Sequence, residues 1–320
     1  YMEIEYSILP YLNCLSVTVL DVTFRPTKDL EQKAWLGAAV RNRFLFACEK
    51  VKLYNGMSLR AAFDICPLDE HHFLYKQYAG GFPKCFTWDV SNIKTSLRSF
   101  RLKSEHAYTM SLLVFGTANS LITEIKEAIR HMMDLGLGSP VVALDLIDIQ
   151  VHEPIRLENF ATLCFDEPAK IIIQTRTPLS LLRNRDNATD GYQARLNGFP
   201  SLYQIVKSCV SRLVALNILY SESQNNWANV DSEEKLTKLI DNYANAATSA
   251  WITSASIKHE TTYSTPKQGK DCVYRLSGYI GELTFDNVDN LLLPVIKMMG
   301  LLGIGNDVSY GLGFFDTIIE

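Results

Sequence analysis

The feature that most constrains this chain is a glycine-rich stretch close to the end of the sequence. Five of the seventeen glycines, Gly300, Gly303, Gly305, Gly311 and Gly313, fall within fourteen consecutive residues. Glycine permits positive φ and lets another backbone approach closely. A helix cap followed by a tight turn explains one or two glycines. Five of them favour a joint whose main-chain N–H groups face an extended polyanion.

The stretch has a partial copy in the first half of the chain. Residues 129–138 align with residues 296–305 at a constant offset of 167, and an isoleucine, a methionine, a leucine and two glycines coincide. Each copy follows an amphipathic helix and precedes a β-rich run, at 141–151 and at 314–319. A repeated helix, glycine joint and strand at half the chain length predicts two copies of one supersecondary unit.

Composition limits the classes of function. The length of 320 residues suits about two domains. No apolar run reaches the ~20 residues of a membrane span, and no basic n-region marks a secretory signal, so we expect no membrane partner. Seven scattered cysteines without a C-x-x-C pair predict reduced thiols in a cytoplasmic protein, rather than disulfides or a zinc site. A net charge of −4 means that any nucleic-acid binding must depend on local patches.

The first half of the sequence predicts a β-α-β-β-α-β order. The expected elements are a strand at 15–24, a helix at 30–50, strands at 98–103 and 106–116, a helix at 118–134 and a strand at 141–151. Residues 52–92 contain scattered glycine and proline, so we interpret them as a long irregular insertion. This order of elements is that of the ferredoxin-like fold.

The second half predicts the same order. Its expected elements are a strand at 169–177, a helix at 201–220, strands at 251–263 and 272–285, a helix at 287–302 and a strand at 314–319. We therefore expect an α+β fold of tandem ferredoxin-like (RRM-like) βαββαβ domains. The predicted domains are residues 1–153, with the insertion at about 52–92, and residues 154–320, with the glycine-rich loop.

Several stretches resemble the CRISPR repeat-processing endoribonucleases of the RAMP superfamily of CRISPR-associated proteins. The most specific are the strand sequence Leu-Ser-Gly-Tyr-Ile-Gly-Glu-Leu-Thr-Phe285 and the joint Leu-Gly-Ile-Gly-Asn-Asp-Val-Ser-Tyr-Gly-Leu-Gly313. Residues 36–44, and residues 178–182 followed by 199–202, are similar to the family's first helix and to the opening of its second domain. The resemblance spans most of the chain and is loose before residue 110.

The resemblance implies a fold, a partner and a reaction. Tandem ferredoxin-like domains would bind the repeat RNA of a precursor transcript and cleave it without a metal or other cofactor. A 2′-hydroxyl would attack the adjacent phosphate, leaving a 2′,3′-cyclic phosphate and a 5′-hydroxyl. Other CRISPR-associated proteins are further partners that it implies, and a homodimer stays open.

Such cleavage needs a base near the 2′-hydroxyl, an acid near the leaving oxygen and a cation facing the phosphate. Many family members carry a histidine in or just after the first helix, whereas this chain has no histidine before His71. The catalytic candidates are His71, His72, His259 and Lys52. An exposed loop or strand residue is the alternative for each of the three histidines.

The RNA-binding candidates are basic, aromatic or glycine residues. Arginine and lysine would contact phosphates, and tyrosine would stack on unpaired bases. The set is Arg41, Arg43, Arg183, Arg185, Lys258, Tyr263, Lys267, Lys270, Gly303, Gly305, Tyr310, Gly311 and Gly313. For the charged members, a solvated surface is the alternative.

Three functions remain open from the sequence. The leading one is processing of CRISPR repeat RNA. The second is a non-catalytic RNA-binding subunit of a CRISPR effector complex, which the missing histidine and the acidic net charge favour. The third is a ferredoxin-like small-molecule or oligomerisation module in which the glycine joint is only structural.

Overall fold

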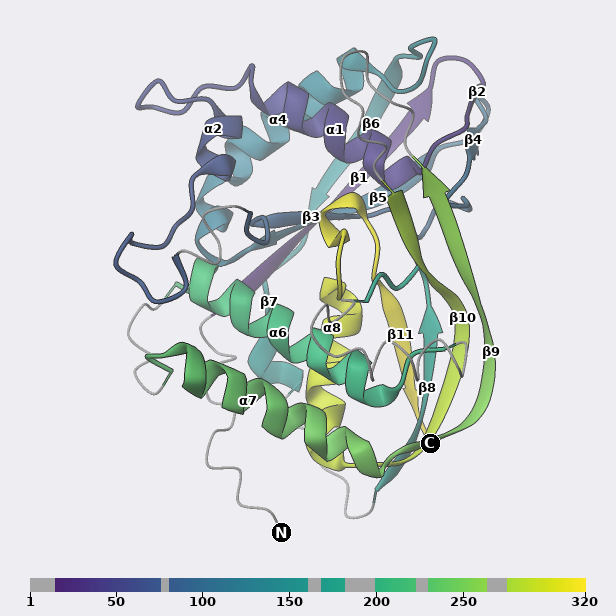
Figure 1. Ribbon diagram of the computed structural model, residues 1–320. Coiled ribbons are helices and arrows are strands. Elements are labelled where there is room, and N and C mark those ends of the chain that lie inside the picture. Colours follow the sequence, from purple (N-terminus) through teal and green to yellow (C-terminus); the bar gives the residue numbers. More distant parts are fainter. Residues whose placement is uncertain (1–14, 76–80, 161–167, 182–198, 223–229, 264–274) are drawn as a thin grey trace.

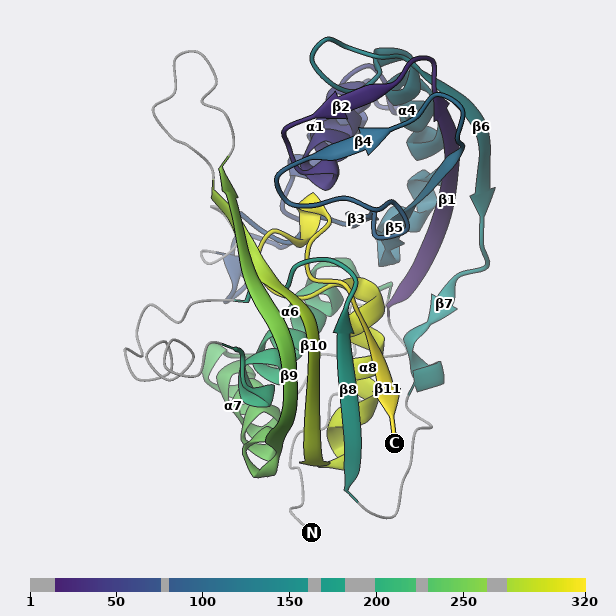
Figure 2. The same ribbon diagram turned by 90° about the vertical axis from the view of Figure 1, so that its right-hand side faces the viewer.

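The computed structural model describes residues 15–75, 81–160, 168–181, 199–222, 230–263 and 275–320. Two antiparallel sheets with helices packed on them lie end to end (Figures 1 and 2). We call them the N-terminal sheet and the C-terminal sheet. The glycine-rich loop, residues 303–314, lies between the two sheets in both views.

The N-terminal sheet has the strand order β3-β5-β1-β6, and the short strand β7 (Ile155–Arg156) also pairs with β1. The four main strands are β1 (Ser16–Pro26), β3 (Phe86–Asp89), β5 (Tyr108–Phe115) and β6 (Leu144–Val151). Alternation along β1 buries Leu20, Val22 and Phe24. Helices α1 (Leu36–Cys48) and α4 (Ile122–Leu135) pack together in this half, α4 following the 3-10 helix η2 (Gly116–Leu121).

The C-terminal sheet has the strand order β11-β8-β10-β9. Its strands are β8 (Ala169–Thr175), β9 (Trp251–Tyr263), β10 (Arg275–Val288) and β11 (Phe315–Ile319). Its helices are α6 (Leu202–Tyr220), α7 (Glu233–Ala246) and α8 (Leu293–Leu302), with 3-10 turns η4 (Ala247–Ser249) and η5 (Asn290–Leu292). In each sheet the first strand of its half lies between the fourth and the third, with the second at one edge. This is the ferredoxin-like arrangement, and the predicted fold class is confirmed.

The backbone also confirms the internal repeat. Helix α4 ends at Gly136 with φ 64°, and α8 ends at Gly303 with φ 76°. One residue further on, the N–H of Leu137 donates to Val142 O, and the N–H of Ile304 donates to Gly313 O. The second copy therefore has a longer loop built on the same closing hydrogen bond.

The structure corrects the predicted elements between residues 30 and 103. The helix predicted from residue 30 begins at Leu36, because Leu30–Gln32 forms a separate strand, β2. Strand β2 pairs with β4 (Phe100–Leu102) in a small two-stranded sheet, so the predicted strand at 98–103 is not part of the N-terminal sheet. Its place is taken by β3, whose four residues are all buried.

The segment at 52–92 is therefore not wholly irregular. It contains β3 and the helix α2 (Leu59–Asp64), which Ser58 caps by accepting a hydrogen bond from the N–H of Ala61. Phe86 and Trp88 of β3 pack edge-on against Phe44 of α1, with ring centroids 5.1 and 5.4 Å away. The predicted boundary between the domains, after residue 153, lies between β6 and β7 and stays a prediction.

Helix α6 is long and apolar enough to span a membrane by length and composition, the one such helix in the part of the chain that the structure describes. Two-thirds of it (67%) is buried inside the protein. Ser201 caps it, with a reciprocal bond from the N–H of Ser201 to Gln204. It has the packing of a core helix.

Candidate nucleic-acid interface

The glycine-rich loop is held against the N-terminal half by hydrogen bonds to its main chain. Trp35 Nε1, at the start of α1, donates to Tyr310 O at 2.5 Å. Thr87 Oγ1 of β3 donates to Val308 O at 2.6 Å, and this bond is buried. Both acceptors belong to the short 3-10 helix η6 (Val308–Tyr310). The loop is therefore a contact between the two halves of the chain as well as a turn between α8 and β11.

The loop's glycines allow backbone to lie directly against backbone. A Cβ on Gly305, where φ is 84°, would lie 2.1 Å from Ser180 O. A Cβ on Gly313, where φ is 86°, would lie 2.0 Å from Ile304 O. A Cβ on Gly37 of α1 would lie 2.1 Å from Tyr310 O. At these positions a side chain is excluded by the protein's own main chain.

Several loop N–H groups are also engaged within the protein. The N–H groups of Asn306 and Gly313 donate to Ser180 O and Pro178 O, and that of Gly311 donates to Val308 O. The prediction that the joint offers its main chain to a polyanion therefore does not apply to these three donors. Gly303, Gly305, Gly311 and Gly313 stay RNA-binding predictions.

Arg41 and Tyr310 form the side-chain contact at this junction. The guanidinium carbon of Arg41 lies 4.4 Å from the centroid of the Tyr310 ring, and both residues are half-buried. Arg41 is four residues after Gly37, so both face the loop. Arg43 is two residues further along the helix, about 200° around its axis, and lies on the opposite side. Of these two predicted phosphate contacts, only Arg41 lies against the loop.

A ladder of backbone pairs connects the loop to the strand that carries His259. Gly305 pairs with Ser180, Leu179 pairs with Tyr279, and Tyr279 pairs with His259. At ~4.8 Å for each step, His259 lies about 14 Å from Gly305. Its ring meets the ring of Tyr279 edge-on, with centroids 5.0 Å apart.

Lys258 occupies the opposite face of strand β9 from His259, because successive side chains alternate. Its ammonium group pairs with Glu260 Oε1 at 2.7 Å. A phosphate contact at Lys258 would therefore compete with this carboxylate. Lys258 stays an RNA-binding prediction.

The other catalytic candidates follow the far end of α1, away from the loop contact at its first turns. Lys52 is exposed and pairs with Ser58 in a short bridge. His71 is exposed beside Glu70, with Nε2 3.8 Å from Oε1. His72 stacks on Phe73 and accepts a hydrogen bond from the N–H of Leu74, and burial lowers its pKa. In Figure 1, α2 and the segment after it lie on the opposite side of the molecule from β9 and β10.

The structure thus divides the four catalytic candidates between two places. Lys52, His71 and His72 lie in the segment after α1, and His259 lies on β9. Their catalytic roles stay predictions. Arg183, Arg185, Lys267 and Lys270 lie outside the described residues, and so does the side chain of Tyr263.

Three residues that hold the loop were missed by the sequence reasoning: Trp35, Gly37 and Thr87. Gly37 begins a run of three small residues, Gly-Ala-Ala39, in the stretch 36–44 that is similar to the family's first helix, and such a run is a signal for close approach. Thr87 lies in a segment that was interpreted as irregular, and its role depends on the unpredicted strand β3. No group of three or more His, Cys, Asp or Glu side chains among the described residues could hold a metal ion.

No protein-family model matches the sequence, and no curated protein matches it either. Solved structures do match. A Cas6 product complex aligns with 94% of this chain and 100% of its own, at 12% identity and a TM-score of 0.55. The fold is that of Cas6. A Thermus thermophilus Cas6 aligns with 95% of this chain and 99% of its own, at 10% identity and a TM-score of 0.51.

The Cas6 fold also occurs within larger assemblies. A partial Cas6-RT-Cas1–Cas2 complex matches at 13% identity and a TM-score of 0.56, over 96% of this chain. This chain spans about half (46%) of that protein's length, and 29% of the corresponding chain in a second Cas6-RT-Cas1–Cas2 complex. The likeness to Cas6 confirms the resemblance that the sequence shows to the CRISPR repeat-processing proteins. Identities of 10–13% show the fold alone.

Proposed function

We propose that this protein binds CRISPR repeat RNA and cleaves it without a metal, through attack of a 2′-hydroxyl on the adjacent phosphate. The observation that carries the proposal is the glycine-rich loop seated on α1, with Arg41 over Tyr310, in a chain that follows Cas6 along nearly its whole length. One Cas6 with this fold was solved with its product. The loop, α1 and the upper end of the β9–β10 hairpin lie where the two sheets meet (Figures 1 and 2).

In this proposal Arg41 faces the scissile phosphate. The pentavalent phosphorane that forms during attack carries additional negative charge, and a fixed guanidinium stabilises it. The ring of Tyr310 and the first turns of α1 hold Arg41 in place. His259 contacts the RNA at a second point, about 14 Å from Gly305 along the ladder of backbone pairs.

The test of cleavage uses purified protein in EDTA with end-labelled repeat RNA from the array in its own genome. A parallel RNA carries one 2′-deoxy substitution at the cut. We expect a single cut that EDTA does not affect and that the 2′-deoxy RNA abolishes. Cleavage that requires a divalent metal, or that tolerates the 2′-deoxy nucleotide, contradicts the mechanism.

The test of the site compares Arg41→Met with Arg43→Met, which removes the same charge from the opposite side of α1. Loss of one transition-state cation costs roughly 10²–10³ in the cleavage rate, so we expect that loss for Arg41→Met. Arg43→Met should change the rate less than about threefold, because Arg43 lies on the side of the helix away from the loop. Equal effects of the two variants contradict the assignment of Arg41.

A second candidate function is RNA binding without cleavage, as a subunit of a CRISPR effector complex. The separation of Lys52, His71 and His72 from His259 favours it, because the catalytic candidates do not meet. A salt-sensitive gel shift with intact RNA selects this function. Absence of any shift at low salt contradicts both RNA proposals and favours the small-molecule or oligomerisation module.

A further inference from the structure

A pocket of about 250 Å³ lies between the N-terminal sheet and helix α8. One wall is the face of β1 and β5 that points away from α1 and α4. The opposite wall comes from α8, from Arg176 after β8, and from the 3-10 helix η3 (Leu157–Phe160). None of the residues assigned to catalysis or RNA binding lines it. The pocket is therefore separate from the loop site, and the inference does not depend on the proposed function.

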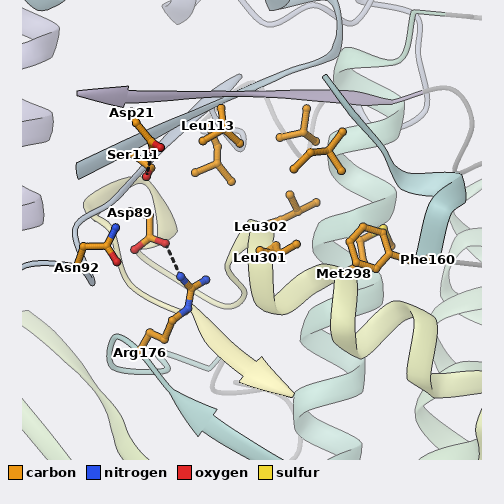
Figure 3. A pocket seen from close by; sticks show the side chains of 13 residues that line it. Asp21, Asp89, Asn92, Ser111, Leu113, Phe160, Arg176, Met298, Leu301 and Leu302 are labelled. Carbon is orange, nitrogen blue, oxygen red and sulfur yellow. Dashed lines mark hydrogen bonds and ion pairs between the residues drawn. The ribbon is translucent and has the colours of Figure 1, made fainter. Parts of the chain in front are cut away.

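Most of the pocket wall is apolar. Val19 and Leu113 come from the sheet, Phe160 from η3, and Met298 and Leu301 from α8. In Figure 3, Phe160 and Met298 lie together at one end of the pocket and the polar side chains gather at the other. Leu301 is 39% exposed, so its side chain is incompletely covered by the protein. This end suits the apolar body of a ligand.

The polar end is organised around two carboxylates. Asp21 accepts a hydrogen bond from Ser111 Oγ at 2.6 Å and contacts His152 Nε2 at 2.7 Å. Asp89 pairs with Arg176 at 2.9 Å (Figure 3). Two oxygens of an ionised carboxylate offer about four acceptor sites. Asp21 is thus fixed by its neighbours and can still accept a hydrogen bond from a ligand.

The charge of this end is negative. Asp21 and Asp89 line the pocket against a single guanidinium, that of Arg176. Arg176 is also shared with Asp316, whose Oδ1 lies 3.3 Å from its Nε. The lining itself carries two carboxylates and one guanidinium, an excess of one negative charge, which attracts a cation and repels an anion.

The volume sets the size of the ligand. At ~30 Å³ for a water molecule, the pocket holds about eight waters, which corresponds to roughly ten non-hydrogen atoms. We propose that the pocket binds a small organic cation, with its ammonium group beside Asp21 and its apolar body against Leu113, Phe160 and Met298. Such a ligand would contact both halves of the protein and stabilise their arrangement by linkage.

Phenethylamine, 2-phenylethanol and phenylacetate form a probe series of nearly constant shape that changes only the charge of the head group. Binding to the full chain is measured by ligand-observed NMR at pH 8. For a ligand of this size we expect a Kd on the order of 0.1–1 mM for phenethylamine. The alcohol should bind at least tenfold more weakly and phenylacetate should not bind.

Asp21→Asn should weaken phenethylamine binding about tenfold and abolish its preference over the alcohol. The matched control is Asp148→Asn, which removes an exposed charge from β6 on the same face of the sheet, opposite Thr23 of β1. Its Kd should stay within twofold. Leu301→Ser is the second variant, because this side chain makes part of the apolar wall; it should weaken both the amine and the alcohol while retaining the preference.

The proposal is overturned if the amine shows no saturable binding at concentrations 10-fold above the expected Kd range. It is also overturned if the acid binds equally, or if Asp21→Asn and Asp148→Asn weaken binding equally. If Asp21→Asn does not fold, the head-group series and Leu301→Ser decide the question alone. Binding of the amine that Leu301→Ser leaves unchanged would place it outside the pocket and also overturn the proposal.

Discussion

At the scale of single residues, Gly37 matters because a side chain at its position would collide with the main chain of the loop. Gly37 has helical backbone angles, which any residue can adopt, so its backbone conformation does not require glycine. Glycine is required by the Tyr310 carbonyl, which accepts the indole N–H of Trp35 and lies where a Cβ would be. Neither the carbonyl nor the helix can move away by rotating a side chain. The contact between the halves therefore requires a residue without a Cβ at this position.

For Gly37→Ala we expect a loss of about 2–3 kcal/mol in the free energy of unfolding, the usual cost of overpacking a rigid site. The helix propensity of alanine alone predicts the opposite sign, a gain of ~1 kcal/mol. Urea unfolding followed by far-UV circular dichroism measures the difference. A more stable variant would show that the loop does not rest on α1.

Asp29 provides a pH-dependent prediction. Hydrogen bonds from Lys103 Nζ, and from the N–H and Oγ of Ser104, lower the pKa of this exposed carboxyl from 3.8 to about 2. Because the folded pKa is lowered, the stabilisation is present above pH ~4 and is lost as the pH falls toward 2. A ¹³C titration of the side-chain carboxyl should show a midpoint near 2.

Lys103→Met should raise that midpoint toward 3.8, since the ammonium hydrogen bond is the largest cause of the shift. Lys94→Met removes a lysine for which no bond to Asp29 is described, and it should leave the midpoint unchanged. An unshifted Asp29 in the Lys103 variant would mean that the bond does not persist in solution.

At the scale of elements, local signals define the helices better than the short strands. Helix α6 begins where Ser201 and Gln204 form a reciprocal cap, a pattern readable from four residues. Strand β3 has four residues, all buried, and no alternation to distinguish it from a loop. Residues 100–102, which the sequence predicts as a strand of the N-terminal sheet, do alternate, and they pair with Leu30–Gln32 in the small two-stranded sheet. The alternation at 100–102 correctly predicts a strand, but it carries no information about which strand pairs with it.

The cap of α6 can be tested directly. Ser201→Ala removes the acceptor for the N–H of Gln204, and we expect a loss of about 1 kcal/mol in the free energy of unfolding. Ser211→Ala, in the interior of the same helix, is the matched control and should change stability by less than about 0.5 kcal/mol. Equal effects would mean that the helix does not begin at Ser201.

At the scale of the whole molecule, Arg176 joins the two halves. It follows the first strand of the C-terminal sheet, pairs with Asp89 at the end of β3, and donates to Gly300 O in α8 at 3.3 Å. Its side chain is 24% exposed and that of Asp89 is 10% exposed. Breaking such a pair leaves a charge largely cut off from water, which costs more than a surface pair contributes.

For Arg176→Met we expect a loss of about 3 kcal/mol in the free energy of unfolding. The double variant Arg176→Met with Asp89→Asn should lose less than the sum of the two single variants, because it removes the buried carboxylate that Arg176→Met alone would leave unpaired. Arg101→Met, which removes the exposed partner of Glu31, should cost less than about 1 kcal/mol. Additive losses in the double variant would show that the pair does not couple the halves.

The sequence by itself determined the fold class, the internal repeat and the position of the glycine joint. These follow from hydrophobic period, helix caps and glycine spacing, which act over a few residues. The tertiary structure alone decided that β3 joins the sheet, that Arg41 and not Arg43 meets the loop, and that Lys52, His71 and His72 lie apart from His259. Each depends on contacts between residues distant in the chain, such as Phe86 with Val114 or Thr87 with Val308. The free energy of those contacts is gained only when the whole chain has folded, so they cannot be predicted from the pattern of neighbouring residues in the sequence.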